Sequence, residues 1–168
     1  MKNVIEGRRF GFAPRPQLAP LAAGLGIAVT LLDLMAWFGW GARDTNGFVI
    51  AAYWIAVATA IVALLATITA LVESTDAAED DRPLARLDLL AALVAFLLYA
   101  VSCALRVGDQ GAAAASPGAL LAALAGLVVL LVDGVIAATL YAGREWQVLD
   151  EDDEPRRHAR PPLHSRSR

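Results

Sequence analysis

Hydrophobic residues fall into four long runs that short polar segments separate. Each run holds about 20 residues or more, the length a helix needs to cross a hydrocarbon core of roughly 30 Å. The runs lack the alternation of apolar and polar residues that membrane strands show, and a helix bonds its own backbone in lipid. The pattern therefore predicts four membrane-spanning helices, over Leu18–Trp40, Phe48–Val72, Leu84–Leu105 and Gly118–Ala142.

Short connections and small residues predict how these helices pack. Consecutive helices joined by short loops lie side by side and run in opposite directions. Small residues let helix backbones approach each other in lipid. In the second run they recur every three or four positions, at Ala52, Ala56, Ala60, Ala63, Thr67 and Ala70. We therefore expect an all-α integral membrane protein, an antiparallel up-down-up-down bundle of four transmembrane helices.

The basic residues predict the orientation of the bundle. Of the 14 Lys and Arg residues, twelve lie before the first run, between the second and third, or after the fourth. These are Lys2, Arg8, Arg9, Arg15, Arg82, Arg86, Arg144, Arg156, Arg157, Arg160, Arg166 and Arg168. Only Arg43 and Arg106 lie on the other side. The positive-inside rule therefore places both termini in the cytoplasm.

The segments outside the runs are polar and rich in Pro or charge. Residues 1–17 are predicted to be a flexible cytoplasmic tail, residues 18–148 the transmembrane domain, and residues 149–168 a disordered charged tail. We expect the first run to be retained as a helix, because its apolar core is too long for a signal peptide. The abundance of Ala and the use of Arg over Lys indicate a bacterium with a GC-rich genome, hence the cytoplasmic (inner) membrane.

Composition argues against the common chemistries. The chain is 58% hydrophobic, which leaves no room for a second folded domain beside four spans. Its two histidines, His158 and His164, both lie in the C-terminal tail, and its one cysteine is Cys103. There is no metal-ligand spacing, phosphate loop or nucleophile motif. We therefore expect no enzyme, no catalytic residue, no metal, no cofactor and no nucleic-acid partner.

Two carboxylates inside the runs are the candidate polar sites. An ionisable group in the apolar region normally faces the protein interior and has a partner. Asp33 lies seven residues before the outer end of the first run, roughly 10 Å deep. Arg106, at the outer end of the third run, extends inward to that depth. The sequence predicts an Asp33–Arg106 pair, with Tyr99 as a further hydrogen-bond donor.

Asp133 in the fourth run has no basic residue at its own depth. The hydroxyls of Thr59 and Thr67 are expected on either side of it, or the acid is protonated, since burial disfavours the charged form. Asp133 and Asp33 are either a proton or cation site or hydrogen-bonding groups that fix helix packing. The second reading is favoured for both.

Four further charged residues form a cytoplasmic boundary cluster at the ends of the second and third runs: Glu73, Asp76, Arg86 and Asp88. Local ion pairing is the favoured interpretation. The alternative is a polar entry that leads toward Asp133.

The chain resembles the bacterial membrane family known as Domain of Unknown Function 2231 over about residues 18–148. The similar pieces are Leu32-Asp33-Leu34-Met35-Ala36-Trp37, the second run from Phe48, Leu97-Leu98-Tyr99-Ala100-Val101-Ser102 with Arg106, and the fourth run before Gly143-Arg144. Where that family has a His-Pro opening, this chain has Leu18-Ala19-Pro20. The resemblance implies a four-helix inner-membrane protein without assigned activity, and the departure from the His-Pro opening argues against a histidine-based role.

Three functions fit these observations. The first is a structural or accessory membrane subunit without enzymatic activity, embedded in the lipid bilayer, alone, as a homo-oligomer or in a larger complex. The second is a small proton- or cation-coupled transporter or channel that uses Asp133 and also Asp33. The third is an accessory protein of a redox chain, with a quinone or a haem that a partner supplies.

Overall fold

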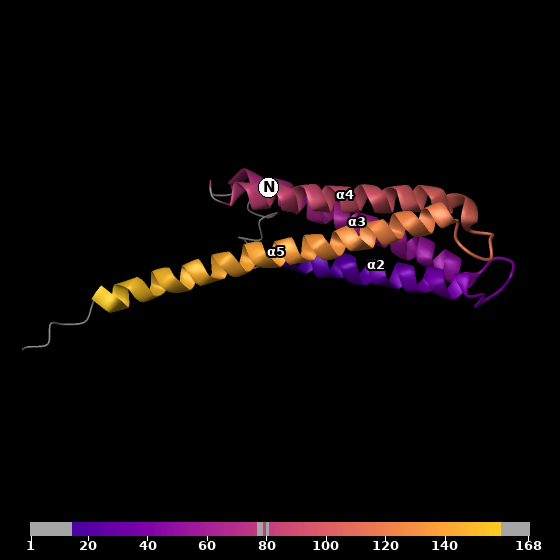
Figure 1. Cartoon of the computed structure of the whole chain (residues 1–168), viewed down its shortest axis with the longest axis horizontal. Coiled ribbons are helices and arrows are strands. Elements are labelled where there is room, and N and C mark those ends of the chain that lie inside the picture. Colours follow the sequence, from indigo (N-terminus) through magenta and orange to yellow (C-terminus); the bar gives the residue numbers. More distant parts are fainter. Residues whose placement is uncertain (1–14, 77–78, 80, 159–168) are drawn as a thin grey trace, which may run out of the picture.

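The computed structural model describes residues 15–76, 79 and 81–158, with side chains described within 16–75, 79 and 81–140. These residues form four α-helices and one short 3₁₀-helix (Figure 1): α2 (Arg15–Trp37), α3 (Gly47–Asp76), α4 (Arg82–Arg106), η1 (Val107–Asp109) and α5 (Pro117–His158). Within the described segments every regular element is a helix and there is no strand, as the sequence predicts.

The four helices form a bundle in which each packs against two others. α3 packs between α2 and α4, α5 packs against α4, and α5 also contacts α2, less extensively. α2 and α4 therefore face each other across the interior, and so do α3 and α5. Figure 1 shows that α5 extends well past the other helices.

All four helices are long and apolar enough to cross a membrane. The stretches that qualify are Pro16–Trp37, Gly47–Thr75, Arg82–Asp109 and Pro117–Leu140. This is the architecture of a multi-pass membrane protein.

The core consists of one stripe per helix, and most of its buried apolar residues are alanines. On α4 the buried positions alternate by three and four: Ala85, Asp88, Ala92, Ala95, Tyr99, Ser102 and Arg106. This spacing of 3.5 residues keeps one face toward the bundle as helices coil around each other. Alanine at these positions allows close backbone approach. The larger apolar side chains, such as Leu64 and Leu97, face outward instead.

α2 ends three residues earlier than the sequence predicts, because a glycine terminates it. Gly39 has a φ of 79°, the left-handed conformation that closes many helices. The amide of Gly39 donates to the carbonyl of Ala36 and that of Trp40 to Met35, both at 3.0 Å. This pair of hydrogen bonds is the Schellman motif.

Asn46 joins the two loops that meet at one end of the bundle, residues 38–46 and 107–116, here called the two-loop end. Its Oδ1 accepts from the amide of Phe48 at 3.0 Å and so caps α3. Its Nδ2 donates to the carbonyls of Trp40 and Ala113, each at 2.8 Å. A Cβ at Gly41 would collide with this side chain, so the loop requires glycine there.

α5 continues to His158, although its composition predicts disorder from residue 149. A helix that is already formed adds residues at little cost. Asp152 and Asp153 precede Arg156 and Arg157 by four positions, a spacing that favours helix. The rest of both predicted tails, residues 1–14 and 159–168, lies outside the described residues.

Candidate functional site

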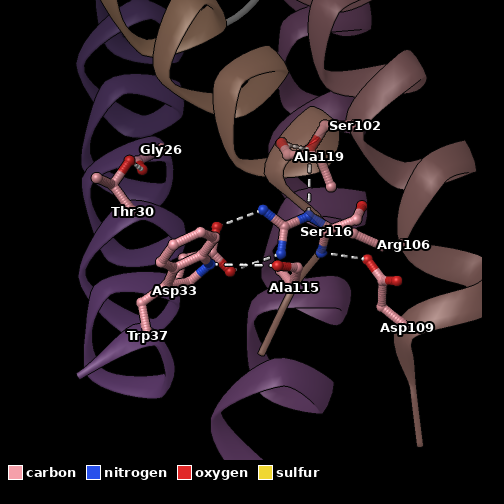
Figure 2. Close-up of polar contacts among 10 residues, drawn as sticks. All are labelled: Gly26, Thr30, Asp33, Trp37, Ser102, Arg106, Asp109, Ala115, Ser116 and Ala119. Carbon is pink, nitrogen blue, oxygen red and sulfur yellow. Dashed lines mark hydrogen bonds and ion pairs between the residues drawn. The ribbon is translucent and has the colours of Figure 1, made fainter. Parts of the chain in front are cut away.

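Asp33 and Arg106 form the ion pair that the sequence predicts (Figure 2). Arg106 Nη1 donates to Asp33 Oδ1 at 2.7 Å, and Nη2 donates to Oδ2 at 2.5 Å. Both side chains are completely buried. Two parallel charge-assisted bonds fix distance and orientation together. The pair joins α2 to α4 across the bundle interior.

A serine extends this pair to a third helix. Arg106 Nε donates to Ser102 Oγ at 3.1 Å, and the Ser102 hydroxyl donates to the carbonyl of Ala119 on α5 at 2.9 Å. Ser102 is fully buried. The resulting chain, from Asp33 through Arg106 and Ser102 to Ala119, holds α2, α4 and α5 at one level.

The two-loop end covers this polar chain with further hydrogen bonds, as Figure 2 shows. Trp37 Nε1, one turn after Asp33 on α2, donates to the carbonyl of Ala115 at 3.2 Å. The amide of Ser116 donates to Asp109 Oδ2 at 2.7 Å at the start of α5. The loops therefore close over the ion pair.

Tyr99 lies deeper, between two glycines, and does not reach Asp33. A Cβ at Gly126 of α5 would lie 2.8 Å from Tyr99 Cε2, and a Cβ at Gly26 of α2 would meet the hydroxyl. The Tyr99 hydroxyl is buried and has no hydrogen-bond partner among the described residues. Tyr99 precedes Arg106 by two turns, roughly 10 Å. The predicted hydrogen bond from Tyr99 to Asp33 is therefore wrong.

Asp133 is fully buried on the core stripe of α5, in a separate place from the ion pair. It follows Ala119 by fourteen residues, roughly 21 Å along the helix. Thr59 and Thr67 donate their hydroxyls to the carbonyls of Ile55 and Ala63 in their own helix, at 2.7 and 2.8 Å. These hydroxyls are therefore not donors to Asp133, and the two carboxylates do not form one site.

The predicted boundary cluster is divided between the core and the surface. Asp88 is buried on the core stripe of α4, whereas Arg86, two residues earlier, is exposed. Glu73 is half-buried on α3. The side chain of Asp76 lies outside the described ones.

Ser102, Asn46 and Asp109 are not among the site residues that the sequence predicts. Only the spacing of four between Ser102 and Arg106 points to their contact, because residues four apart share a helix face. Asn46 immediately before an apolar run is a helix-cap signal. Its contact with Ala113 in the other loop carries no local signal.

Metal-binding groups are absent from the described part of the chain: no three His, Cys, Asp or Glu residues gather there in a way that could hold an ion. No protein-family model, curated protein or solved structure matches the chain. The resemblance to the Domain of Unknown Function 2231 family stays a prediction.

Proposed function

We propose that this chain is a multi-pass protein of a bacterial inner membrane that serves as a structural or accessory subunit without enzymatic activity. The four apolar helices and the alanine-rich core support a packing role. It acts alone, as a homo-oligomer or within a larger membrane complex.

The proposal includes an antiparallel bundle with both termini in the cytoplasm. The hydrogen bonds between residues 45–46 and 111–112 support this order, because they put the α2–α3 and η1–α5 connections at one end. The concentration of Lys and Arg outside that end supports the orientation.

The observation that carries the proposal is the complete burial of the Asp33–Arg106 pair beneath the two loops. A transport site has to exchange a proton or ion with water on each side. Asp33 instead accepts from both Nη atoms of Arg106, is completely buried, and lies beneath two loops that are bonded to each other. Such a carboxylate fixes the helices in place.

Asp133 supports the second candidate, a proton- or cation-coupled transporter or channel. It is a fully buried carboxylate on a helix of membrane-spanning length, and such residues commonly mark ion pathways. The Asp33–Arg106 arrangement gives this candidate no support at the two-loop end.

A flux assay separates the two functions. The purified protein is placed in liposomes with a pH-sensitive dye or, in a second set, a sodium-sensitive dye inside, and a membrane potential is applied. We expect proton and sodium flux equal to that of protein-free liposomes, for the natural protein and for Asp133→Asn. A flux that Asp133→Asn abolishes, and that Asp44→Asn in the exposed loop leaves intact, would establish transport instead.

A further inference from the structure

An apolar groove lies between α2 and α5, away from the polar chain of the two-loop end. Its volume is about 540 Å³, within the roughly 300–1,000 Å³ of ordinary ligand sites. It is lined chiefly by small and aliphatic residues, among them Ala19, Ala23, Gly24, Leu130, Gly134 and Ala138. The beginning of α2 and the later part of the membrane-spanning stretch of α5 form its walls.

The groove is a space that the chain itself leaves unfilled. A Cβ added at Gly24 or at Gly134 would meet no atom within 4 Å. Leu131 and Val135 on its edge are 50% and 65% exposed, so the groove opens sideways to the surroundings of the bundle. At this depth those surroundings are lipid tails, and a hydrocarbon chain suits such a lining.

Two arginine positions, one on each wall helix, lie near the end of the groove at which α2 begins. Arg15 is the first residue of α2, directly before Pro16 of the groove lining. Arg144 follows Ala138 on α5 by six residues, roughly 9 Å. Glu145 directly follows Arg144, and the longer acidic run from Asp150 begins about 18 Å beyond Ala138, outside the head-group region. Each wall helix thus supplies one arginine position at the level of lipid head groups.

We propose that this groove binds a phospholipid with an anionic head group. One acyl chain lies between α2 and α5, and the phosphate lies at the level of Arg15 at the start of α2 and of Arg144 within α5. Basic sites between membrane helices commonly take anionic head groups. This lipid fills part of the contact between α2 and α5, which is less extensive than the other three helix contacts. Its binding therefore stabilises the folded bundle by mass action.

The test uses the full chain, stripped of lipid in mild detergent. Dioleoyl phosphatidylglycerol and dioleoyl phosphatidylcholine share their acyl chains and differ in head-group charge. We expect phosphatidylglycerol to raise the melting temperature more, and native mass spectrometry to retain one such lipid per chain. Equal shifts with the two lipids would overturn the proposal.

A second test of the proposal fills the groove with larger side chains. Leucine in the double variant Gly24→Leu, Gly134→Leu occupies the vacant space, so the phosphatidylglycerol shift should vanish. Ala125→Leu adds the same bulk to an exposed position of α5 outside the groove lining and should keep it. A shift that survives in the double variant, or a dimer of the natural protein that the double variant converts to a monomer, would overturn the proposal.

The arginines are tested apart from the groove, in case the filled variant does not fold. Arg15→Gln and Arg144→Gln leave the apolar lining intact. Each should weaken phosphatidylglycerol binding roughly fivefold and leave phosphatidylcholine binding unchanged. Unchanged affinity for phosphatidylglycerol in both variants would contradict the assigned head-group position.

Discussion

Arg106 and Asp33 connect two helices that face each other diagonally in the bundle, through two parallel hydrogen bonds of 2.7 and 2.5 Å. Few side chains are long enough to cross between such helices. A buried pair of this kind is often no more stabilising than apolar residues of the same volume. Its geometry, however, admits one axial register of α2 against α4. We therefore interpret the pair as a device that fixes register.

Asn46 should be the most sensitive position of the two-loop end. Asn46→Ala removes the α3 cap and both side-chain bonds to the loops. Loss of a cap costs about 1 kcal/mol, and each of the two part-buried hydrogen bonds to the carbonyls of Trp40 and Ala113 contributes about 0.5–1.5 kcal/mol. We expect a clear fall in melting temperature, measured by circular dichroism in detergent. Thr45→Ala, an exposed neighbour, is the control, and equal melting of the two variants would contradict the assigned contacts.

Tyr99→Phe should stabilise the bundle or leave it unchanged. The hydroxyl is buried without a partner among the described residues, and such a group costs about 1–3 kcal/mol. Removing it keeps the ring between Gly26 and Gly126. Thermal unfolding of the variant is the measurement. A marked destabilisation would show that the hydroxyl has a hydrogen-bond partner in the membrane.

Removal of the Tyr99 hydroxyl should have different effects on alanine substitutions at the two glycines beside the ring. Alanine at Gly26 collides with that hydroxyl, whereas alanine at Gly126 collides with ring carbons at 2.8 and 2.9 Å. Each substitution should cost about 1–3 kcal/mol through overpacking. Tyr99→Phe should rescue Gly26→Ala and leave Gly126→Ala impaired. Equal rescue, or none at either site, would contradict this placement of the ring.

The proposed topology is open to labelling with a maleimide that does not cross membranes. Cys103 is the one native cysteine, so Cys103→Ser gives a background without thiols. Gln110→Cys, exposed at the two-loop end, should react in intact cells. Glu79→Cys, exposed between α3 and α4, should react only after permeabilisation. The opposite pattern would invert the topology.

The sequence predicts the helices and the ion pair for the same reason. A membrane gives every residue of a spanning helix a depth, so two residues at equal depth are candidates for contact. Depth counting succeeds for Asp33 and Arg106. It fails for Tyr99, which lies two turns before Arg106 on α4, roughly 10 Å from the level of the ion pair. It also cannot place Thr67, whose hydroxyl bonds to its own helix.

The contacts of the two-loop end lie beyond such reasoning. Loop residues have no periodicity, so nothing local shows that Asn46 binds the carbonyl of Ala113, 67 residues away. The groove between α2 and α5 is equally hidden, because an unfilled space results from the relative position of two helices. Small residues line the groove, but buried alanines also line the contact between α2 and α3, so their presence does not predict an unfilled space.

The most direct test of the account is a double-mutant cycle on Asp33 and Arg106. Asp33→Asn, Arg106→Gln and the double variant are unfolded reversibly with a denaturing detergent in mixed micelles. Breaking a buried pair from one side costs about 3–5 kcal/mol, because one charge is left uncompensated. We predict a double variant at least about 2 kcal/mol more stable than the sum of the single losses implies. Losses that add to within about 0.5 kcal/mol would contradict a pair that fixes the bundle.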